Sequence, residues 1–482
     1  MNTQEHGAAL QAIARRAMMR YGLEPDWPPE VRVELSKLSE IGSTAARDLR
    51  ALPWSSIDND DSRDLDQLEV CIDGPSQRLL IAIADVDAWV RKGSALDAHA
   101  ETNTTSVYTP ARIFPMLPPE LSTDLTSLNE HADRDAVVVD MVIGDDGVAA
   151  QSDVYRARVR NRAKLTYEAV AAWLDGRGPA PAAFGSDPDL PGQVKLQDRI
   201  AERLRAKREE EGALDFDRTE LKPVVTEGVV TDLRTEESNR ARDLIESFMV
   251  AANGVTAGFL SSRGYPSIRR VVRSPERWPR IVDLAGRYGV QLPPEPDAHA
   301  LEAFLKAQRT AKPDEFADLS LSVIKLLGRG EYVAQTPGGT SAGHFALAVS
   351  NYTHSTAPNR RFPDLVTQRL VKAAVAGTPV PYPLAELAPL AAHCTKQEDA
   401  ANKVERLVRK AAAALWMSSR IGQEFDAVVT GASNKGTWVR LRVPPVEGRL
   451  ERGAEGLDVG DRVRVRLLST DPEQGFIDFG RV

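Results

Sequence analysis

The spacing of apolar residues divides the chain into three regions of different character. In the first region, apolar residues recur at helical intervals: Leu10, Ile13, Ala14, Ala17 and Tyr21. The pattern stops at Gly22, which predicts an amphipathic helix over 7–22. A second helical pattern covers 31–38. We therefore expect residues 1–48 to form a small helical module, with a helix-turn-helix variant as one arrangement.

Strand patterns dominate the second region from about residue 49 to 170. The clearest runs are 79–84, 136–139 and 154–159. A stretch rich in Pro, Gly and Ala follows over 176–192, and helical patterns then alternate with loops to about residue 420. Strands followed by helices within one region predict an α+β domain, which we place at 49–420.

The last region returns to short strands at regular spacing: 427–429, 438–441, 463–467 and 476–479. This spacing suits a small five-stranded barrel of the OB type, which we place at 421–482. No internal repeat is visible. The chain is thus predicted to be an α+β protein with a helical module before its main domain and a barrel after it.

Composition indicates a soluble protein. The 482 residues are 42% hydrophobic and 27% charged, which provides enough apolar material for a large core. No stretch approaches the length of a membrane span, and no secretory signal is visible. The two cysteines, Cys71 and Cys394, have no paired spacing and fit a reducing compartment. The net charge of −8 argues against bulk nucleic-acid binding, but it allows a basic internal groove. We expect a cytoplasmic monomer.

A short segment near the front of the main domain carries five carboxylates: Asp58, Asp60, Asp61, Asp64 and Asp66. Like charges this close repel one another unless a cation lies among them. Clustered carboxylate oxygens suit Mg²⁺, Mn²⁺ or Ca²⁺. The segment lies between two strand patterns, so it predicts a metal-binding loop of a hydrolase.

Two other interpretations of this segment exist. Counted from Asp58, side-chain oxygens fall at the ligand positions of an EF-hand, with Glu69 at the last one. However, Arg63 stands where the sharp turn of that loop needs glycine, and the flanking segments alternate like strands. The other interpretation is a solvated acidic turn, because most charge runs are exposed.

Two cationic segments add candidate binding sites. Residues 156–164 alternate basic with small or neutral residues, so a strand would place five cations on one face, either as a solvated surface or as a track for phosphates. Tyr167 follows and offers a stacking surface for a base. Arg360 and Arg361 lie between prolines and suit either a phosphate or an ion pair with Asp364.

Six segments resemble, in the same order, motifs of the ribonuclease II/R (RNB-type) family: 56–66, 81–86, 114–118, 163–167, 244–253 and 352–361. The resemblance covers about residues 50–420 and implies the RNB-type catalytic domain, with a mixed sheet and surrounding helices. The tail from Gly422 resembles the RNA-binding OB domain of these enzymes, including Gly436 before an aromatic-led strand at Trp438.

The resemblance implies a metal-dependent 3′→5′ exoribonuclease that degrades single-stranded RNA to nucleoside 5′-monophosphates with Mg²⁺ or Mn²⁺. Carried over by motif, Asp58, Asp64 and Asp66 are metal ligands and water-orienting carboxylates. Arg360 is the residue that fixes the scissile phosphate. The residues implied in RNA binding are Tyr108, Tyr167, Phe216, Arg361, Glu405 and Trp438.

The chain departs from the family pattern at two places. The family's fourth carboxylate is replaced by Gln67, an amide that can ligate a cation without adding charge. A second metal should therefore bind more weakly, unless Asp60 or Asp61 compensates. The family also commonly places two cold-shock domains before its catalytic domain, and residues 1–48 are too few to form them.

Gln67 motivates a rival hypothesis, a catalytically silent RNA-binding or regulatory homologue. The joint presence of Asp58, Asp64, Asp66 and Arg360 favours the enzyme.

Overall fold

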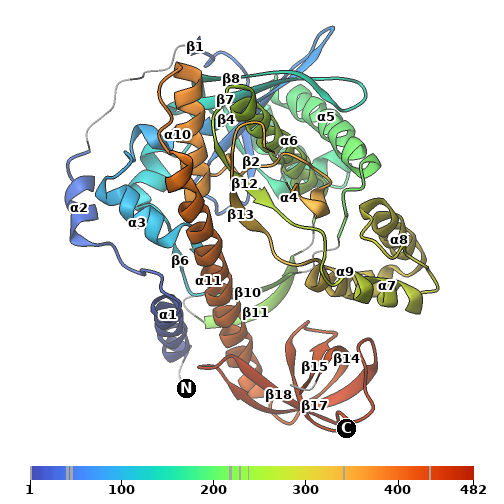
Figure 1. Ribbon diagram of the computed structural model, residues 1–482. Coiled ribbons are helices and arrows are strands. Elements are labelled where there is room, and N and C mark those ends of the chain that lie inside the picture. Colours follow the sequence, from blue (N-terminus) through green and yellow to red (C-terminus); the bar gives the residue numbers. More distant parts are fainter. Residues whose placement is uncertain are drawn as a thin grey trace.

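A central α+β body with a small barrel below it makes up most of the structure (Figure 1). The computed structural model describes residues 3–38, 43, 47–216, 220–226, 229–236, 238–339, 342–433 and 436–482. The long helix α11 (Leu384–Met417) runs from the central body to the barrel. The predicted α+β architecture is confirmed, whereas the boundaries 1–48, 49–420 and 421–482 stay predictions.

A seven-stranded mixed sheet forms the centre of the main domain, in the order β1-β8-β7-β4-β3-β2-β9. Its strands are β1 (Arg47–Asp48), β2 (Ser55–Asp58), β3 (Gln67–Ile72), β4 (Gln77–Ala84), β7 (Asp133–Ile143), β8 (Ala149–Arg160) and β9 (Ala163–Thr166). The outer pairs β1–β8 and β2–β9 are parallel, and the other neighbours are antiparallel. Strand β1 thus joins this sheet although the sequence placed its residues in the N-terminal module.

Helices and three short ladders surround this sheet. The helices are α3 (Ala95–Asn103), α4 (Tyr167–Leu174), α5 (Leu190–Glu210), α6 (Arg240–Ser262), α7 (Trp278–Arg287), α8 (Ala298–Ala311), α9 (Pro313–Leu327) and α10 (Phe362–Ala376). The ladders pair β5 (Val107–Tyr108) with β6 (Ile113–Phe114), β10 (Glu220–Thr226) with β11 (Val229–Glu236), and β12 (Ser267–Val271) with β13 (Glu331–Gln335).

The main hydrophobic core lies between the sheet and its helices. It joins buried residues of β3, β4, β7 and β8 with those of α5, α6 and α10. Helix α5 packs on β3, and α6 packs on β7 and β8. Helices α7 to α9 form a separate cluster around Trp278 and Phe304. Helix α4 packs on β2 and β9 at the edge of the sheet and is itself packed against α6.

Helix α6 differs from the expectation that no segment reaches the length of a membrane span. By length and composition, its 23 residues are apolar enough to cross a membrane. Of its most apolar window, 56% is buried inside the protein, where Phe248 and Leu260 belong to the main core. Burial of this kind is what makes a core helix apolar.

The two N-terminal helices pack on different partners. Helix α1 (Thr3–Arg20) buries Leu10 and Ile13 against Val404 and Val408 of α11. Helix α2 (Pro29–Leu35) packs on α3. This arrangement differs from the compact helix pair of a helix-turn-helix.

The C-terminal strands form the predicted barrel. Five strands close in the order β14-β15-β16-β18-β17. They are β14 (Glu424–Ser433), β15 (Gly436–Leu441), β16 (Glu447–Arg452), β17 (Arg462–Asp471) and β18 (Phe476–Arg481). Buried and less buried residues alternate along β15 and β17, as expected for a small barrel filled by side chains.

The cationic segment at β8 and β9 is not a free phosphate track. Its four arginines form ion pairs at 2.5–3.3 Å: Arg156 with Asp85, Arg158 with Asp135, Arg160 with Asp133 and Arg162 with Asp187. Alternation along a strand predicted the shared face correctly, but it gave no information on the aspartates that lie opposite.

Candidate active site

The aspartate-rich segment is a loop between β2 and β3, as the sequence predicted. Leu65 anchors this loop because its side chain is buried and its backbone is paired in both directions. Its N–H donates to Ser127 Oγ at 3.0 Å, and its carbonyl oxygen accepts from the N–H of Leu128 at 2.9 Å. Asp64 and Asp66 flank this anchor and therefore hold defined positions.

The first half of the loop is fixed by Lys164 on β9. Its Nζ donates to the carbonyl oxygens of Asp60 and Ser62 at 2.7 and 2.6 Å. Ser62 Oγ in turn donates to Asp58 Oδ1 at 2.9 Å. Both flanking elements are strands, so the EF-hand interpretation is wrong.

Asp66 is the most buried carboxylate of the loop, at 1% exposure. Its Oδ1 accepts from the N–H of Asn359 at 2.9 Å. Its Oδ2 has no hydrogen-bond partner among the described residues and lies 3.4 Å from Nε of Arg360. Burial raises the pKa of Asp66 to about 7, although the charge of Arg360 opposes this shift. A solvated acidic turn does not describe this residue.

Arg360, from a segment far along the chain, lies beside the aspartate loop. Its carbonyl oxygen accepts from the N–H of Ser106 at 2.9 Å, and its side chain is 46% exposed. Burial raises the pKa of Asp64, and the charge of Arg360 partly offsets that effect. The hydroxyl of Tyr108 donates to Asp64 Oδ2 at 3.4 Å. Asp64, Asp66, Arg360 and Tyr108 thus form one cluster from segments far apart in the sequence.

Tyr108 is held in this cluster by α11. Its backbone N–H donates to Glu405 Oε1 at 2.8 Å, while its side chain remains exposed. Glu405 therefore positions the backbone that carries the ring, and its predicted contact with RNA stays a prediction.

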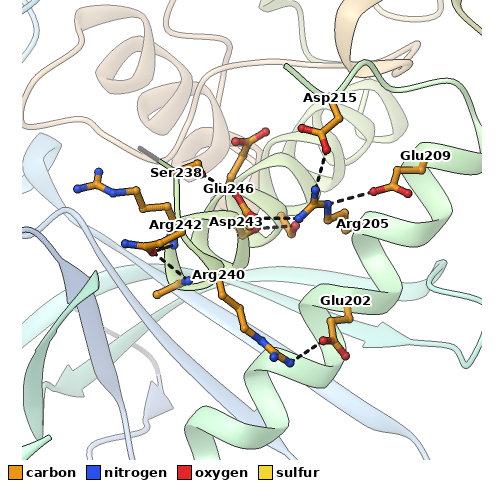
Figure 2. Close-up of polar contacts among 12 residues, drawn as sticks. Glu202, Arg205, Glu209, Asp215, Ser238, Arg240, Arg242, Asp243 and Glu246 are labelled. Atoms are coloured by element: carbon orange, nitrogen blue, oxygen red, sulfur yellow. Dashed lines mark hydrogen bonds and ion pairs between the residues drawn. The ribbon is translucent and has the colours of Figure 1, made fainter. Parts of the chain in front are cut away.

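Tyr167 lies on the other side of the loop, at the start of α4. The guanidinium of Arg242 lies 4.6 Å from the centre of its ring and donates to Asn59 Oδ1 at 2.9 Å. Figure 2 shows the polar network that holds this first turn of α6, in which Arg205 bridges Asp215 and Asp243 at 2.8 Å each. One face of the predicted stacking surface is thus covered by an arginine.

A groove of about 710 Å³ is lined by Asp64 and Tyr108. It is formed by the β2–β3 loop, the β5–β6 ladder, strand β10 and helix α11. Its lining contains four cations: Arg63, Arg112, Lys222 and Arg409. A groove whose lining combines these cations with Asp64 and the exposed ring of Tyr108 suits a single polyanionic strand.

The carboxylates fit a divalent cation by their chemistry. Within the described ranges, no three Asp, Glu, His or Cys side chains are already gathered as a metal site. Asp66 Oδ2 accepts no hydrogen bond, and burial raises the pKa values of Asp64 and Asp66 although the charge of Arg360 opposes the shift, so a cation among these carboxylates would stabilise their ionised forms. Asp58, Asp64 and Asp66 would supply the hard oxygen ligands that Mg²⁺ prefers.

Three other predicted RNA-binding residues have different surroundings from one another. Arg361 forms the ion pair that the sequence offered as an alternative: its Nη2 lies 2.7 Å from the buried carboxylate of Asp364 at the start of α10, and its contact with RNA stays a prediction. Phe216 is half-buried against the cluster of α7 to α9 and does not belong to the described groove lining. Trp438 lies half-buried on the barrel, opposite Arg449 in the strand register.

Gln67 begins β3 directly after Asp66 and is 5% exposed. Its role as a metal ligand stays a prediction.

Comparison with protein families shows to which family the chain belongs. The RNB domain matches residues 46–377, and the RNase II-type exonuclease C-terminal S1 domain matches residues 423–482. The chain belongs to the ribonuclease II/R family. Its aspartate loop and Arg360 lie within the RNB match, and the five-stranded barrel is its S1 domain.

Relatives of this RNB-family chain are named ribonuclease R. The enzyme of Aquifex aeolicus is 30% identical over 99% of this chain and 71% of its own length. That of Escherichia coli is 30% identical over 95% of this chain and 60% of its own length. The chain thus spans less than two thirds of several curated relatives that it matches.

Solved structures share the fold. Mycoplasma genitalium RNase R, in complex with ribose methylated single-stranded RNA, has a TM-score of 0.88 at 22% identity, covering 98% of this chain and 78% of that one. Yeast Ssd1, described as a pseudonuclease, has a TM-score of 0.67 at 17% identity, covering 89% of this chain and 52% of that one. The fold therefore occurs in both an RNA-bound ribonuclease and a pseudonuclease.

Sequence reasoning missed the residues that hold the RNB-family site together. Lys164 was counted with the phosphate track, yet it fixes the aspartate loop. Asn359 supplies a backbone N–H to Asp66, and no side-chain pattern reveals such a role. Arg242 lies just before the family motif at 244–253. The sequence does not indicate its contact with Tyr167, which only the fold creates.

Proposed function

We propose that this protein hydrolyses single-stranded RNA from its 3′ end and releases nucleoside 5′-monophosphates, with Mg²⁺ or Mn²⁺ as cofactor. One observation carries the proposal: the buried carboxylate of Asp66 lies 3.4 Å from the partly exposed guanidinium of Arg360, and the neighbouring Asp64 and Tyr108 line a groove. Membership of the ribonuclease II/R family supports it.

Each residue of the cluster has a chemical role in this reaction. Arg360 presents N–H donors to the non-bridging oxygens of the scissile phosphate and offsets their charge. Asp66 orients that guanidinium and is itself held by Asn359. The ring of Tyr108 offers a face for a terminal base, and its hydroxyl donates to Asp64.

Asp58, Asp64 and Asp66 would hold the cation. When bound, the cation lowers the pKa of a water and stabilises negative charge on the phosphate. The three carboxylates in turn lose the repulsion and burial penalty that they carry without it. Gln67 would add an amide oxygen from the start of β3.

The basic groove favours a single RNA strand. Its four cations come from four separate segments and line the same cavity as Tyr108. Because these cations would contact the phosphates of the strand, the affinity for RNA should depend little on the base sequence and should fall as the salt concentration rises. The protein acts, in this proposal, as a cytoplasmic monomer with RNA as its partner.

A catalytically silent RNA-binding homologue is the second candidate. Gln67 in place of a carboxylate and the fold shared with the pseudonuclease Ssd1 favour it. The two candidates differ in a direct assay with an RNA that carries a 5′ label and a single-stranded 3′ tail. The enzyme shortens the RNA stepwise from the 3′ end, and blocking that end with a 3′-phosphate slows the shortening. The silent homologue binds the RNA and leaves its length unchanged.

A further inference from the structure

Trp27 lies between α1 and α2 and lines the groove that contains Asp64 and Tyr108. Its side chain is half-buried, and the other lining residues that the structure describes all lie at Asn59 or beyond. Trp27 also precedes the residues that the RNB domain matches. Its place in the groove therefore comes from the fold of this chain and not from a family motif.

Contacts with α3 hold the segment that carries Trp27. The N–H of Glu24 donates to Asn103 Oδ1 at 2.8 Å, and Asn103 Nδ2 donates to the carbonyl oxygen of Glu24 at 2.9 Å. Asn103 is 2% exposed, so water competes little for these two hydrogen bonds. Glu24 Oε2 also lies 3.1 Å from Nδ1 of the buried His99. The backbone three residues before Trp27 is therefore fixed on α3.

The ring of Trp27 is held as well. It packs against the ring of His99, with ring centres 4.6 Å apart and planes inclined by 56°. Asp26, directly before Trp27, forms an ion pair with Arg15 of α1. Because the contact with His99 is tilted and Trp27 also borders the groove, part of the indole remains available on the groove side. An aromatic ring that is already ordered loses little freedom when a ligand stacks on it.

The groove around Trp27 has the two properties that an RNA strand requires. Its lining contains the four cations named above, against the two carboxylates of Asp61 and Asp64. It also offers apolar surface, since Ile113 is 53% exposed and Tyr108 is 39% exposed. Cations attract the phosphates of a strand, and aromatic rings stack on its bases.

We propose that Trp27 stacks on a base of the bound RNA strand, upstream of the terminal base that Tyr108 contacts. The inference rests on the proposed function and deepens it, because it adds a second aromatic contact in the same groove. Tyr108 would hold the strand at its 3′ end, and Trp27 would hold it on the 5′ side of that end. Stacking uses the π-face that all bases share, so Trp27 should raise the affinity for RNA without selecting its sequence.

The test measures RNA affinity without turnover, in EDTA, by fluorescence anisotropy of a labelled RNA of about 12 uridines. Trp27→Ala removes the ring and should weaken binding by about tenfold, whereas Trp27→Phe keeps a ring and should stay within about threefold of wild type. The matched control is Trp173→Ala. Trp173 is also half-buried beside one aromatic ring, that of Phe184 at 4.8 Å, but lies outside the described groove lining. This control should bind the RNA as wild type does.

Indole fluorescence provides a second measurement if Trp27→Ala fails to fold. A stacked base quenches the emission of an indole, so the RNA should quench part of the wild-type emission. Trp27→Phe should lose that part of the quenching while it still binds the RNA. Wild-type affinity in a folded Trp27→Ala, equal weakening by Trp27→Ala and Trp27→Phe, or equal quenching in wild type and Trp27→Phe would overturn the inference.

The outcome separates this inference from the proposed function. A wild-type protein that binds the RNA through Trp27 in EDTA but leaves it intact in Mg²⁺ supports the stacking contact and contradicts the exoribonuclease. A wild-type protein that degrades the RNA in Mg²⁺, with an affinity that Trp27→Ala does not change, supports the exoribonuclease and makes Trp27 a structural residue of the N-terminal segment.

Discussion

Asp66→Asn should abolish hydrolysis and, without metal, make the protein more stable at alkaline pH. In the folded protein, burial raises the pKa of Asp66 from 3.8 to about 7. A raised carboxyl pKa means that the unfolded chain ionises first, so stability is lost as the pH rises from about 4 through 7. Asparagine has nearly the same shape, its Oδ1 can still accept from Asn359, and it carries no charge to bury.

The magnitude follows from the pKa. At 1.36 kcal/mol for each pH unit between the two pKa values, the ionised Asp66 costs roughly 4 kcal/mol at pH 8 and about 1.5 kcal/mol at pH 5. These are upper limits for the gain from Asp66→Asn, because Arg360 loses its partner in the variant. The advantage of the variant over wild type should therefore grow by roughly 2.5 kcal/mol between pH 5 and pH 8.

The assay is urea unfolding in EDTA at pH 5 and pH 8, followed by tryptophan fluorescence. Asp124→Asn is the matched control, because Asp124 is 70% exposed and forms only a 3.7 Å pair with Arg134. Mg²⁺ should then stabilise wild type and have little effect on Asp66→Asn. A variant that is less stable than wild type at pH 8, or whose advantage does not change with pH, would refute the reasoning.

Three further substitutions probe the rest of the site. Arg360→Lys should slow single-turnover hydrolysis by about 100-fold or more with little change in RNA affinity, because an ammonium cannot replace the planar fork of a guanidinium. If the variant instead loses only RNA affinity, measured by filter binding, Arg360 acts in RNA binding alone. Tyr108→Ala should raise the KM for short RNA by about tenfold, as expected for one lost base-stacking contact. Tyr108→Phe keeps the ring and should retain most of the affinity. Equal KM values for the two variants would contradict stacking. Trp438→Ala on the barrel should weaken the binding of long RNA and leave the hydrolysis of short RNA unchanged, and equal effects on both lengths would be inconsistent with a separate S1 contact.

Periodicity and motif order predicted the framework of this protein well. The run over 79–84 became β4, and the strands of the last sixty residues closed into a barrel. The aspartate loop was located between strands because its flanks alternate like strands. These features are local, so the sequence alone reveals them.

The parts that escaped prediction depend on contacts between distant segments. Arg360 and Arg361 are neighbours in sequence, yet one faces Asp66 and the other pairs with Asp364, because the start of α10 turns their side chains apart. The arginines of β8 looked available for phosphates until the facing aspartates of β7 were known. Glu69 entered the sequence analysis only as the last position of a calcium loop, since its burial follows from the packing of β3 within the sheet.

The release of mononucleotides from a single-stranded RNA tests the central claim most directly. Purified protein is incubated with an unstructured RNA in Mg²⁺ or in EDTA, and the soluble products are identified by chromatography against nucleoside 5′- and 3′-monophosphate standards. Asp66→Asn serves as the control for contaminating nuclease. The account predicts nucleoside 5′-monophosphates from wild type in Mg²⁺ only, and none from the variant. Intact RNA in every reaction, nucleoside 3′-monophosphates, or equal release by wild type and Asp66→Asn would contradict it.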